Sequence, residues 1–191
     1  IQAVDVEVCK YGIYLDRCAD TDIANSSVQN NMTTGAIGFY VGGGLGAYDE
    51  GVRLVNCSTN GQYNGIHISG QDWGSLVGCS FTTTHSGGYA LQADSSSDWQ
   101  ITGCQFASGA GSGVGSNVLI QATSSKFVLT GNFIAAGVFG LLLYGDDNVI
   151  VGNSFASNSN VDIWISGSDN NISSNNCRST VSGISIGETT G

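Results

Sequence analysis

Short apolar triplets return along the whole chain, usually after a turn rich in glycine, serine or asparagine. The first and third residues of every triplet are apolar, and the middle residue varies. The copies are Ile13-Tyr14-Leu15, Phe39-Tyr40-Val41, Ile66-His67-Ile68, Tyr89-Ala90-Leu91, Val118-Leu119-Ile120, Leu141-Leu142-Leu143, Ile163-Trp164-Ile165 and Ile184-Ser185-Ile186. This alternation predicts β-strands. The return of the triplet after roughly 21 to 29 residues predicts a solenoid or another array.

A second pattern follows each triplet: a turn, another strand, and then a small polar or thiol residue at one equivalent position. That position is held by Ser26, Cys57, Cys79, Cys104, Asn132, Asn153 and Asn176. A large apolar residue two positions later, such as Phe81 or Phe106, predicts a third strand. Successive coils would then pair in parallel about 4.8 Å apart. Stacked asparagines would hydrogen-bond along the axis.

The turn between the first two strands also repeats. Its copies are Gly70-Gln71-Asp72-Trp73, Ser96-Ser97-Asp98-Trp99, Gly145-Asp146-Asp147-Asn148 and Gly167-Ser168-Asp169-Asn170. Asp and Asn favour such turns because their side chains bond the local backbone and tolerate positive φ. The chain has no proline, which suits strands that use every N–H for pairing.

These repeats resemble the right-handed parallel β-helix family, which includes pectate lyases, polygalacturonases and the tailspike depolymerases of bacteriophages. The resemblance runs from about Ile13 to Ile186. It implies an all-β, single-stranded right-handed parallel β-helix of about seven coils, each of roughly 21 to 31 residues with three short strands. It also implies a virion tail or secreted location and a bacterial surface or extracellular polysaccharide as partner. Because repeats reach both ends without a capping helix, we expect residues 1–191 to be one domain of a longer chain that lacks its caps.

The charge balance narrows the classes of partner. The chain carries 5 Lys and Arg against 15 Asp and Glu, a formal charge of −10. Nucleic acid and anionic membranes call for basic clusters, so neither is expected as a partner. The chain has no apolar segment long enough to predict membrane insertion. The spacing of the six cysteines matches no zinc motif. We therefore expect free thiols, no metal and no cofactor.

The outward residues of the main strand suggest two uses for this face. Read one per coil, they are Tyr14, Tyr40, His67, Ala90, Leu119, Leu142, Trp164 and Ser185. A continuous exposed apolar stripe marks an interface or a binding surface. Leu119 and Leu142 suggest subunit contact in a homotrimer, whereas aromatic residues suit stacking on sugar rings. The candidate substrate-binding residues are Tyr40, Tyr48, His67, Trp73, Tyr144 and Trp164.

Two groups of carboxylates are candidates for catalysis. The long loop at 42–51 would bring Asp49 and Glu50 near Asp72, and two carboxyl groups can act as acid and as base or nucleophile in glycoside hydrolysis. The alternative is that Asp72 is a turn residue and that Asp49 and Glu50 only solvate a loop. Asp146 and Asp147 resemble the paired aspartates of polygalacturonases, which would make them acid and base. The other motifs of that family are missing, and Asp147 shares its place in the turn repeat with Asp72, Asp98 and Asp169.

Three functions therefore remain open. The first is a glycan-processing tailspike or secreted depolymerase. Hydrolysis is favoured over a lyase reaction there, because the few basic residues are scattered along the chain. The second is a carbohydrate-binding or adhesin module without chemistry. The third is a structural segment of a trimeric spike. The motifs do not separate the first from the second.

Overall fold

The computed structural model describes residues 1–7, 9–29, 34–43, 51–109, 115–179 and 181–187. All regular elements of this part of the chain are β-strands, arranged in three parallel sheets around one core. The first sheet contains β2 (Tyr11–Asp16), β5 (Ile37–Gly42), β8 (Asn64–Ser69), β11 (Tyr89–Asp94), β14 (Ser116–Ile120), β17 (Phe139–Leu143), β20 (Val161–Ile165) and β23 (Ser182–Ile186).

The other two sheets have shorter strands. The second sheet contains β3 (Thr21–Ala24), β6 (Val52–Val55), β9 (Gly74–Val77), β12 (Trp99–Thr102), β15 (Val128–Thr130), β18 (Val149–Val151) and β21 (Asn171–Ser173). The third sheet contains β1 (Asp5–Glu7), β4 (Ser27–Gln29), β7 (Ser58–Asn60), β10 (Ser80–Thr83), β13 (Gln105–Ser108), β16 (Phe133–Ala135), β19 (Ser154–Ala156) and β22 (Asn176–Arg178).

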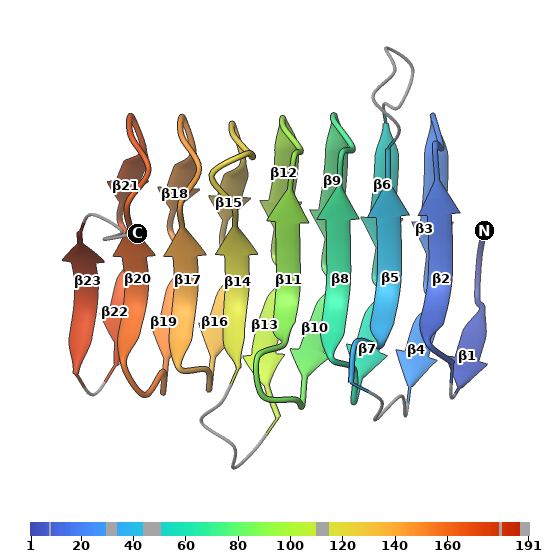
Figure 1. The fold of residues 1–191 in the computed structure, drawn as a ribbon, viewed down its shortest axis with the longest axis horizontal. Coiled ribbons are helices and arrows are strands. Elements are labelled where there is room, and N and C mark those ends of the chain that lie inside the picture. The colour runs from blue at the N-terminus through green and yellow to red at the C-terminus, as the bar shows by residue number, and fades with distance from the viewer. Residues whose placement is uncertain (8, 30–33, 44–50, 110–114, 180, 188–191) are drawn as a thin grey trace.

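The chain visits the first, second and third sheets in turn, so strands β2–β22 form seven coils of three strands (Figure 1). The predicted all-β solenoid with three strands per coil is therefore confirmed. No helix in the described part of the chain is long and apolar enough to cross a membrane.

The register of the first sheet corrects one predicted triplet. Leu91 pairs with Ile66 and Val118, so Leu91-Gln92-Ala93 takes the place expected for Tyr89-Ala90-Leu91. Ala90 is fully buried, and Gln92 is the outward residue of this coil. The error arises because β11 contains two overlapping apolar triplets, and periodicity alone does not choose between them.

A ladder of buried polar and thiol side chains marks the corner between the second and third sheets. Asn132 and Asn153 stack as predicted, and the Nδ2 of Asn153 donates to Leu129 O at 2.9 Å and to Asn175 Oδ1 at 3.1 Å. The last rung is thus Asn175, not Asn176 as predicted. The cysteines of the ladder are free and buried. The hydrogen bond that its thiol donates to Cys104, together with burial, raises the pKa of Cys79 to about 12, so this thiol stays protonated at neutral pH.

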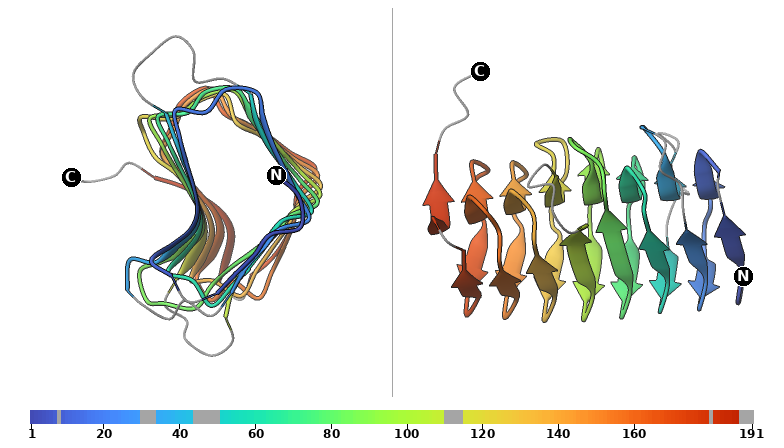
Figure 2. Two further views of the ribbon diagram at one scale, coloured as in Figure 1. Left: turned by 90° about the vertical axis from the view of Figure 1, so that its right-hand side faces the viewer. Right: turned by 90° about the horizontal axis from the view of Figure 1, so that it is seen from below.

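The strands of the first sheet bend near their start. Tyr11 and Tyr14 are three residues apart, yet their rings meet on the outer face with centroids 5.4 Å apart, so alternation breaks between them. In several coils the residue at the bend is glycine, because neighbouring atoms leave no space for a Cβ. A Cβ at Gly65 would lie 2.6 Å from Ala90 O. The bend makes the outer face of the first sheet concave (Figure 2, left), and we call this surface the concave face.

Candidate functional site

Aromatic side chains gather on the first coils of the concave face. Tyr14 and Tyr40 are paired residues of β2 and β5, and their rings stack with centroids 4.7 Å apart and planes 8° apart. Tyr11 meets both rings edge-on. His67 continues the row on β8, with its ring edge-on to Tyr40 at 5.5 Å. Tyr14 is 54% exposed and Tyr11 is 40% exposed, so this row is open to solvent.

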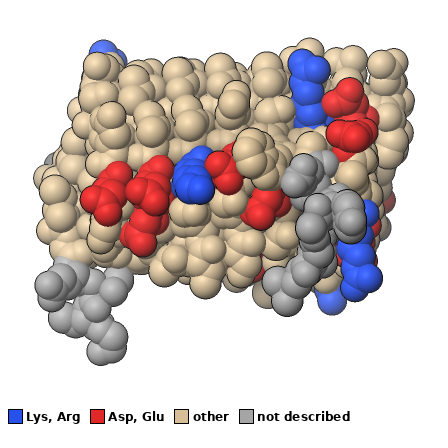
Figure 3. Space-filling model, turned by 90° about the horizontal axis from the view of Figure 1, so that it is seen from above, with Lys and Arg blue, Asp and Glu red and all other residues tan. Residues whose placement is uncertain are grey.

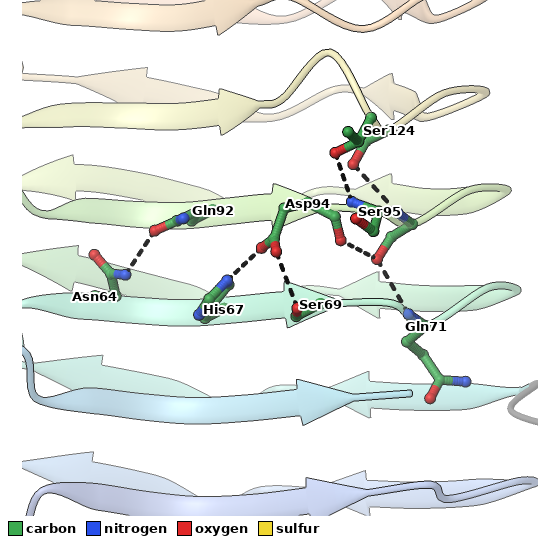
Figure 4. A network of polar contacts seen from close by, with 10 residues as sticks. Asn64, His67, Ser69, Gln71, Gln92, Asp94, Ser95 and Ser124 are labelled. Atoms are coloured by element: carbon green, nitrogen blue, oxygen red, sulfur yellow. Dashed lines mark hydrogen bonds and ion pairs between the residues drawn. The ribbon is translucent and has the colours of Figure 1, made fainter. Parts of the chain in front are cut away.

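A pair formed by a histidine and an aspartate follows the aromatic row. His67 Nε2 bonds Asp94 Oδ1 from the neighbouring strand β11, and Ser69 Oγ donates to Asp94 Oδ2 at 2.9 Å (Figure 4). Burial would raise the pKa of Asp94. The hydrogen bond and charge of His67, with the Ser69 hydrogen bond, outweigh burial and hold this pKa below its ordinary value. Asp94 therefore stays ionised and fixes the orientation of the imidazole.

Two amide side chains extend this polar patch. Asn64 Nδ2 donates to Gln92 Oε1 at 2.9 Å (Figure 4). Asn64 Oδ1 accepts from the backbone N–H of Tyr89 at 2.9 Å. These bonds tie β8 to β11 across the face. The concave face thus offers fixed acceptors and donors directly beside the aromatic row.

The middle of the concave face differs from the sequence expectation. Leu119 and Leu142 are only 3% and 8% exposed within a single chain, so they do not form the exposed stripe that we expected. Burial, and then the charges of Tyr144 and Tyr63, raise the pKa of Tyr89. Tyr144 lines a depression of about 400 Å³ with Gln121, Ala122 and Ser166. The two leucine side chains are therefore buried within a single chain, and subunit contact through them stays a prediction.

Trp164 lies farther along the same row. It pairs with Leu142 and with Ser185, and it is partly exposed. A Cβ at Gly187 would lie 2.9 Å from its ring, so the indole covers Gly187. Of the predicted substrate-binding residues, Tyr40, His67, Tyr144 and Trp164 thus share the concave face.

The turn carboxylates lie elsewhere. They lie in the turns that join the first sheet to the second. Acidic side chains, with a basic one among them, form a row along this edge (Figure 3). Asp72 Oδ1 accepts from Ser97 N at 2.7 Å, and Asp146 Oδ1 accepts from Ser168 N at 2.6 Å. Asp147 has a φ of 57°. Each of these aspartates therefore has a local structural role, whatever further role it has.

The pairing also corrects our alignment of the turns. Trp99 pairs with Gly74, which places Trp73 opposite Asp98 and Asp72 opposite Ser97. Trp73, Asp98, Asp147 and Asp169 all have positive φ. Asp72 is thus equivalent to Asp146, and not to Asp147 as the sequence suggested. Trp73 faces away from the concave face, in a depression over the second sheet. Tyr48, Asp49 and Glu50 lie outside the described residues, so the structure does not place the expected cluster with Asp72.

A family model for the right-handed β-helix region matches residues 1–120 and 64–190. The chain belongs to the right-handed β-helix family. No curated protein and no solved structure matches it. Membership in this family supports the fold and leaves the chemistry to the residues of the β-helix itself.

Some site residues of this β-helix were not found from its sequence. Asp94 and Asn64 were not named as candidates, and Ala90 was expected beside His67 in the place that Gln92 holds. The correct triplet in β11 would have aligned Gln92 with His67 and Asp94 with Ser69. The described residues contain no group of three or more His, Cys, Asp or Glu side chains that could hold a metal ion.

Proposed function

We propose that this β-helix binds a bacterial surface or extracellular polysaccharide along its concave face, as part of a phage tail spike or of a secreted protein. The observation that carries the proposal is the row of Tyr11, Tyr14, Tyr40 and His67, which is partly exposed and adjoins the Asp94 patch. A trimeric assembly belongs to the same proposal and rests on the family resemblance alone.

The chemistry of the row suits sugars. Aromatic faces offer a large apolar surface with polar edges, which matches the C–H faces and hydroxyl groups of a pyranose. Asp94, Ser69 and Gln92 supply acceptors and donors at fixed positions, as binding sites for polar ligands require. Because each coil repeats the same strand, the surface extends along the axis and suits a polymer better than a small molecule.

Charge favours a neutral polymer. The chain has a formal charge of −10, and a field of that sign lowers the local concentration of anionic ligands. The four residues of the row include no lysine or arginine, and the Lys10 ammonium lies 5.6 Å from the centroid of the Tyr11 ring at one end of the row. Neutral sugars, which need stacking and hydrogen bonds, therefore fit this face best.

Cleavage of the glycosidic bond is the second candidate. The His67–Asp94 pair favours it, because a carboxylate that orients an imidazole is a usual component of acid–base catalysis. A pair of carboxylates on the concave face does not favour it: Asp16 and Asp94 are three coils apart, about 14 Å at the usual strand spacing. Hydrolysis needs carboxyl groups within about 10 Å of each other. A hydrolase would therefore use two carboxylates of the Asp49, Glu50 and Asp72 group that the loop and turn suggest, or Asp146 with Asp147 as the resemblance to polygalacturonases implies.

Binding to a panel of neutral and acidic capsular and O-antigen polysaccharides tests the proposal. We expect a neutral polymer to bind, and the Tyr40→Ala substitution to weaken binding by about tenfold or more through lost stacking. Phe133→Ala is the matched control, because Phe133 is 43% exposed on the third sheet. A reducing-end assay on the bound polymer then separates a depolymerase from a binding module. Equal weakening by both substitutions, or no binding to any polymer, would contradict the proposal.

A further inference from the structure

The second sheet carries a depression that is separate from the concave face. It measures about 340 Å³ and is lined by Asp22, Gly51, Val52, Arg53, Trp73, Gly74, Ser75, Asp98 and Gln100. The paired residues Asp22, Arg53, Ser75 and Gln100 occupy successive strands of this sheet. The sheet lies behind the first sheet (Figure 1), so a ligand here would not touch the aromatic row.

Trp73 is the unusual residue of this depression. The turn repeat places Asp98, Lys126, Asp147 and Asp169 at its position, all with φ between 55° and 59°. Asp and Asn tolerate this left-handed conformation, whereas a bulky aromatic residue seldom adopts it. Trp73 has a φ of 57° and is 57% exposed. The β-helix therefore keeps an exposed indole at a positive-φ position where three of the other coils have aspartate and one has lysine, which points from backbone strain to function.

Polar side chains with free capacity surround this indole. The guanidinium of Arg53 makes no ion pair and no hydrogen bond with any other described residue, although Asp22 is directly opposite on the adjacent strand. Asp22 and Asp98 add carboxylate acceptors, and Gln100 adds an amide. Gly74 lines the depression with backbone only, and its missing Cβ faces the core, where the buried ring of Trp99 fills the space.

We infer that this depression is a second carbohydrate site, which binds a single neutral pyranose unit against the Trp73 indole. The volume of the depression favours a small ligand, because about 340 Å³ is near the lower limit for ligand pockets. The charged side chains of the depression favour a neutral ligand, since two carboxylates face one guanidinium. Arg53 would donate to the ring or hydroxyl oxygens, and the two aspartates would accept from hydroxyl groups. This inference does not depend on polysaccharide binding by the concave face.

Saturation-transfer NMR with methyl glucoside, methyl galactoside, methyl mannoside and methyl N-acetylglucosaminide tests the inference on the whole chain. We expect at least one glycoside to receive signal. Trp73→Asn should abolish that signal and Arg53→Gln should weaken binding about five- to tenfold. Trp73→Asn also places a residue that tolerates positive φ in the turn, so its unfolding midpoint should equal or exceed that of the wild type.

Tyr40→Ala separates the two sites. The signal from the glycoside should survive this substitution if the depression binds it. A signal that is lost in Tyr40→Ala and kept in Trp73→Asn would assign binding to the concave face and overturn the inference. Absence of signal from all four glycosides would also overturn it, whether or not a polysaccharide binds to the aromatic row.

Discussion

At the scale of single residues, the contact between His67 and Asp94 defines the polar part of the site. Asp94 is bonded by His67 on one oxygen and by Ser69 on the other. Its folded-state pKa lies below the ordinary value because these bonds outweigh burial. A depressed carboxyl pKa means that the stabilisation is present above the ordinary pKa of 3.8 and is lost as pH falls through the lower folded-state value.

Asp94→Asn should therefore show a pH-dependent effect. We expect it to lower the free energy of unfolding by about 1 kcal/mol at pH 5. The difference from wild type should shrink as pH falls through the lowered folded-state pKa of Asp94, because the carboxyl group is then protonated in both states. Urea unfolding across this range measures the effect, and Ser69→Ala should reproduce part of it. A difference that does not change with pH would show that Asp94 acts through packing and not through its charge.

Single residues also differ in how well their positions could be predicted from the sequence. Spacing alone predicted the stacking of five ladder residues, because each is the only candidate between two recognisable strands. They are Cys57, Cys79, Cys104, Asn132 and Asn153. Asn175 and Asn176 are adjacent amides, and spacing did not tell which one turns inward. Trp73 and Asp72 were misplaced by one residue for the same reason. The pairing of Trp99 with Gly74 decides that register through packing, which no local pattern reveals.

At the scale of elements, the bend in the first sheet builds the site. A regular strand alternates sides, so Tyr11 and Tyr14 would lie on opposite faces. The bend brings both to one face and makes that face concave. Leu119 and Leu142 are buried in this hollow, which sequence alternation alone could not predict. Alternation predicts which side of a sheet a residue faces, whereas its exposure depends on the side chains across the bend.

Gly65→Ala tests the need for small residues at the bend. An added Cβ would lie 2.6 Å from Ala90 O and 2.9 Å from Phe81 Cβ, so the strands must shift. We expect the free energy of unfolding to fall by about 2 to 3 kcal/mol. Ala90→Gly, in the same column, removes a methyl group and should cost about 1 kcal/mol. Equal effects in denaturant unfolding would mean that the bend does not depend on the missing Cβ.

At the scale of the whole molecule, the seven coils combine a continuous core with chemically different surfaces. The core runs through all seven coils. The concave face carries the aromatic row and the Asp94 patch, the turn edge carries acidic side chains, and the second sheet carries the Trp73 depression. Because these surfaces are rigidly spaced by the coils, ligand contacts at one of them can be distinguished from contacts at another.

Hydroxyl-radical footprinting with a bound neutral polysaccharide tests the central claim most directly. Tyr11, Tyr14 and Trp73 are all exposed, so each should oxidise in the free chain. We expect the polysaccharide to protect Tyr11 and Tyr14, and with them Tyr40, while oxidation of Phe133 on the third sheet is unchanged. Protection of Phe133 or of the turn edge, with Tyr11 and Tyr14 oxidised as in the free chain, would contradict the claim that the concave face binds the polymer.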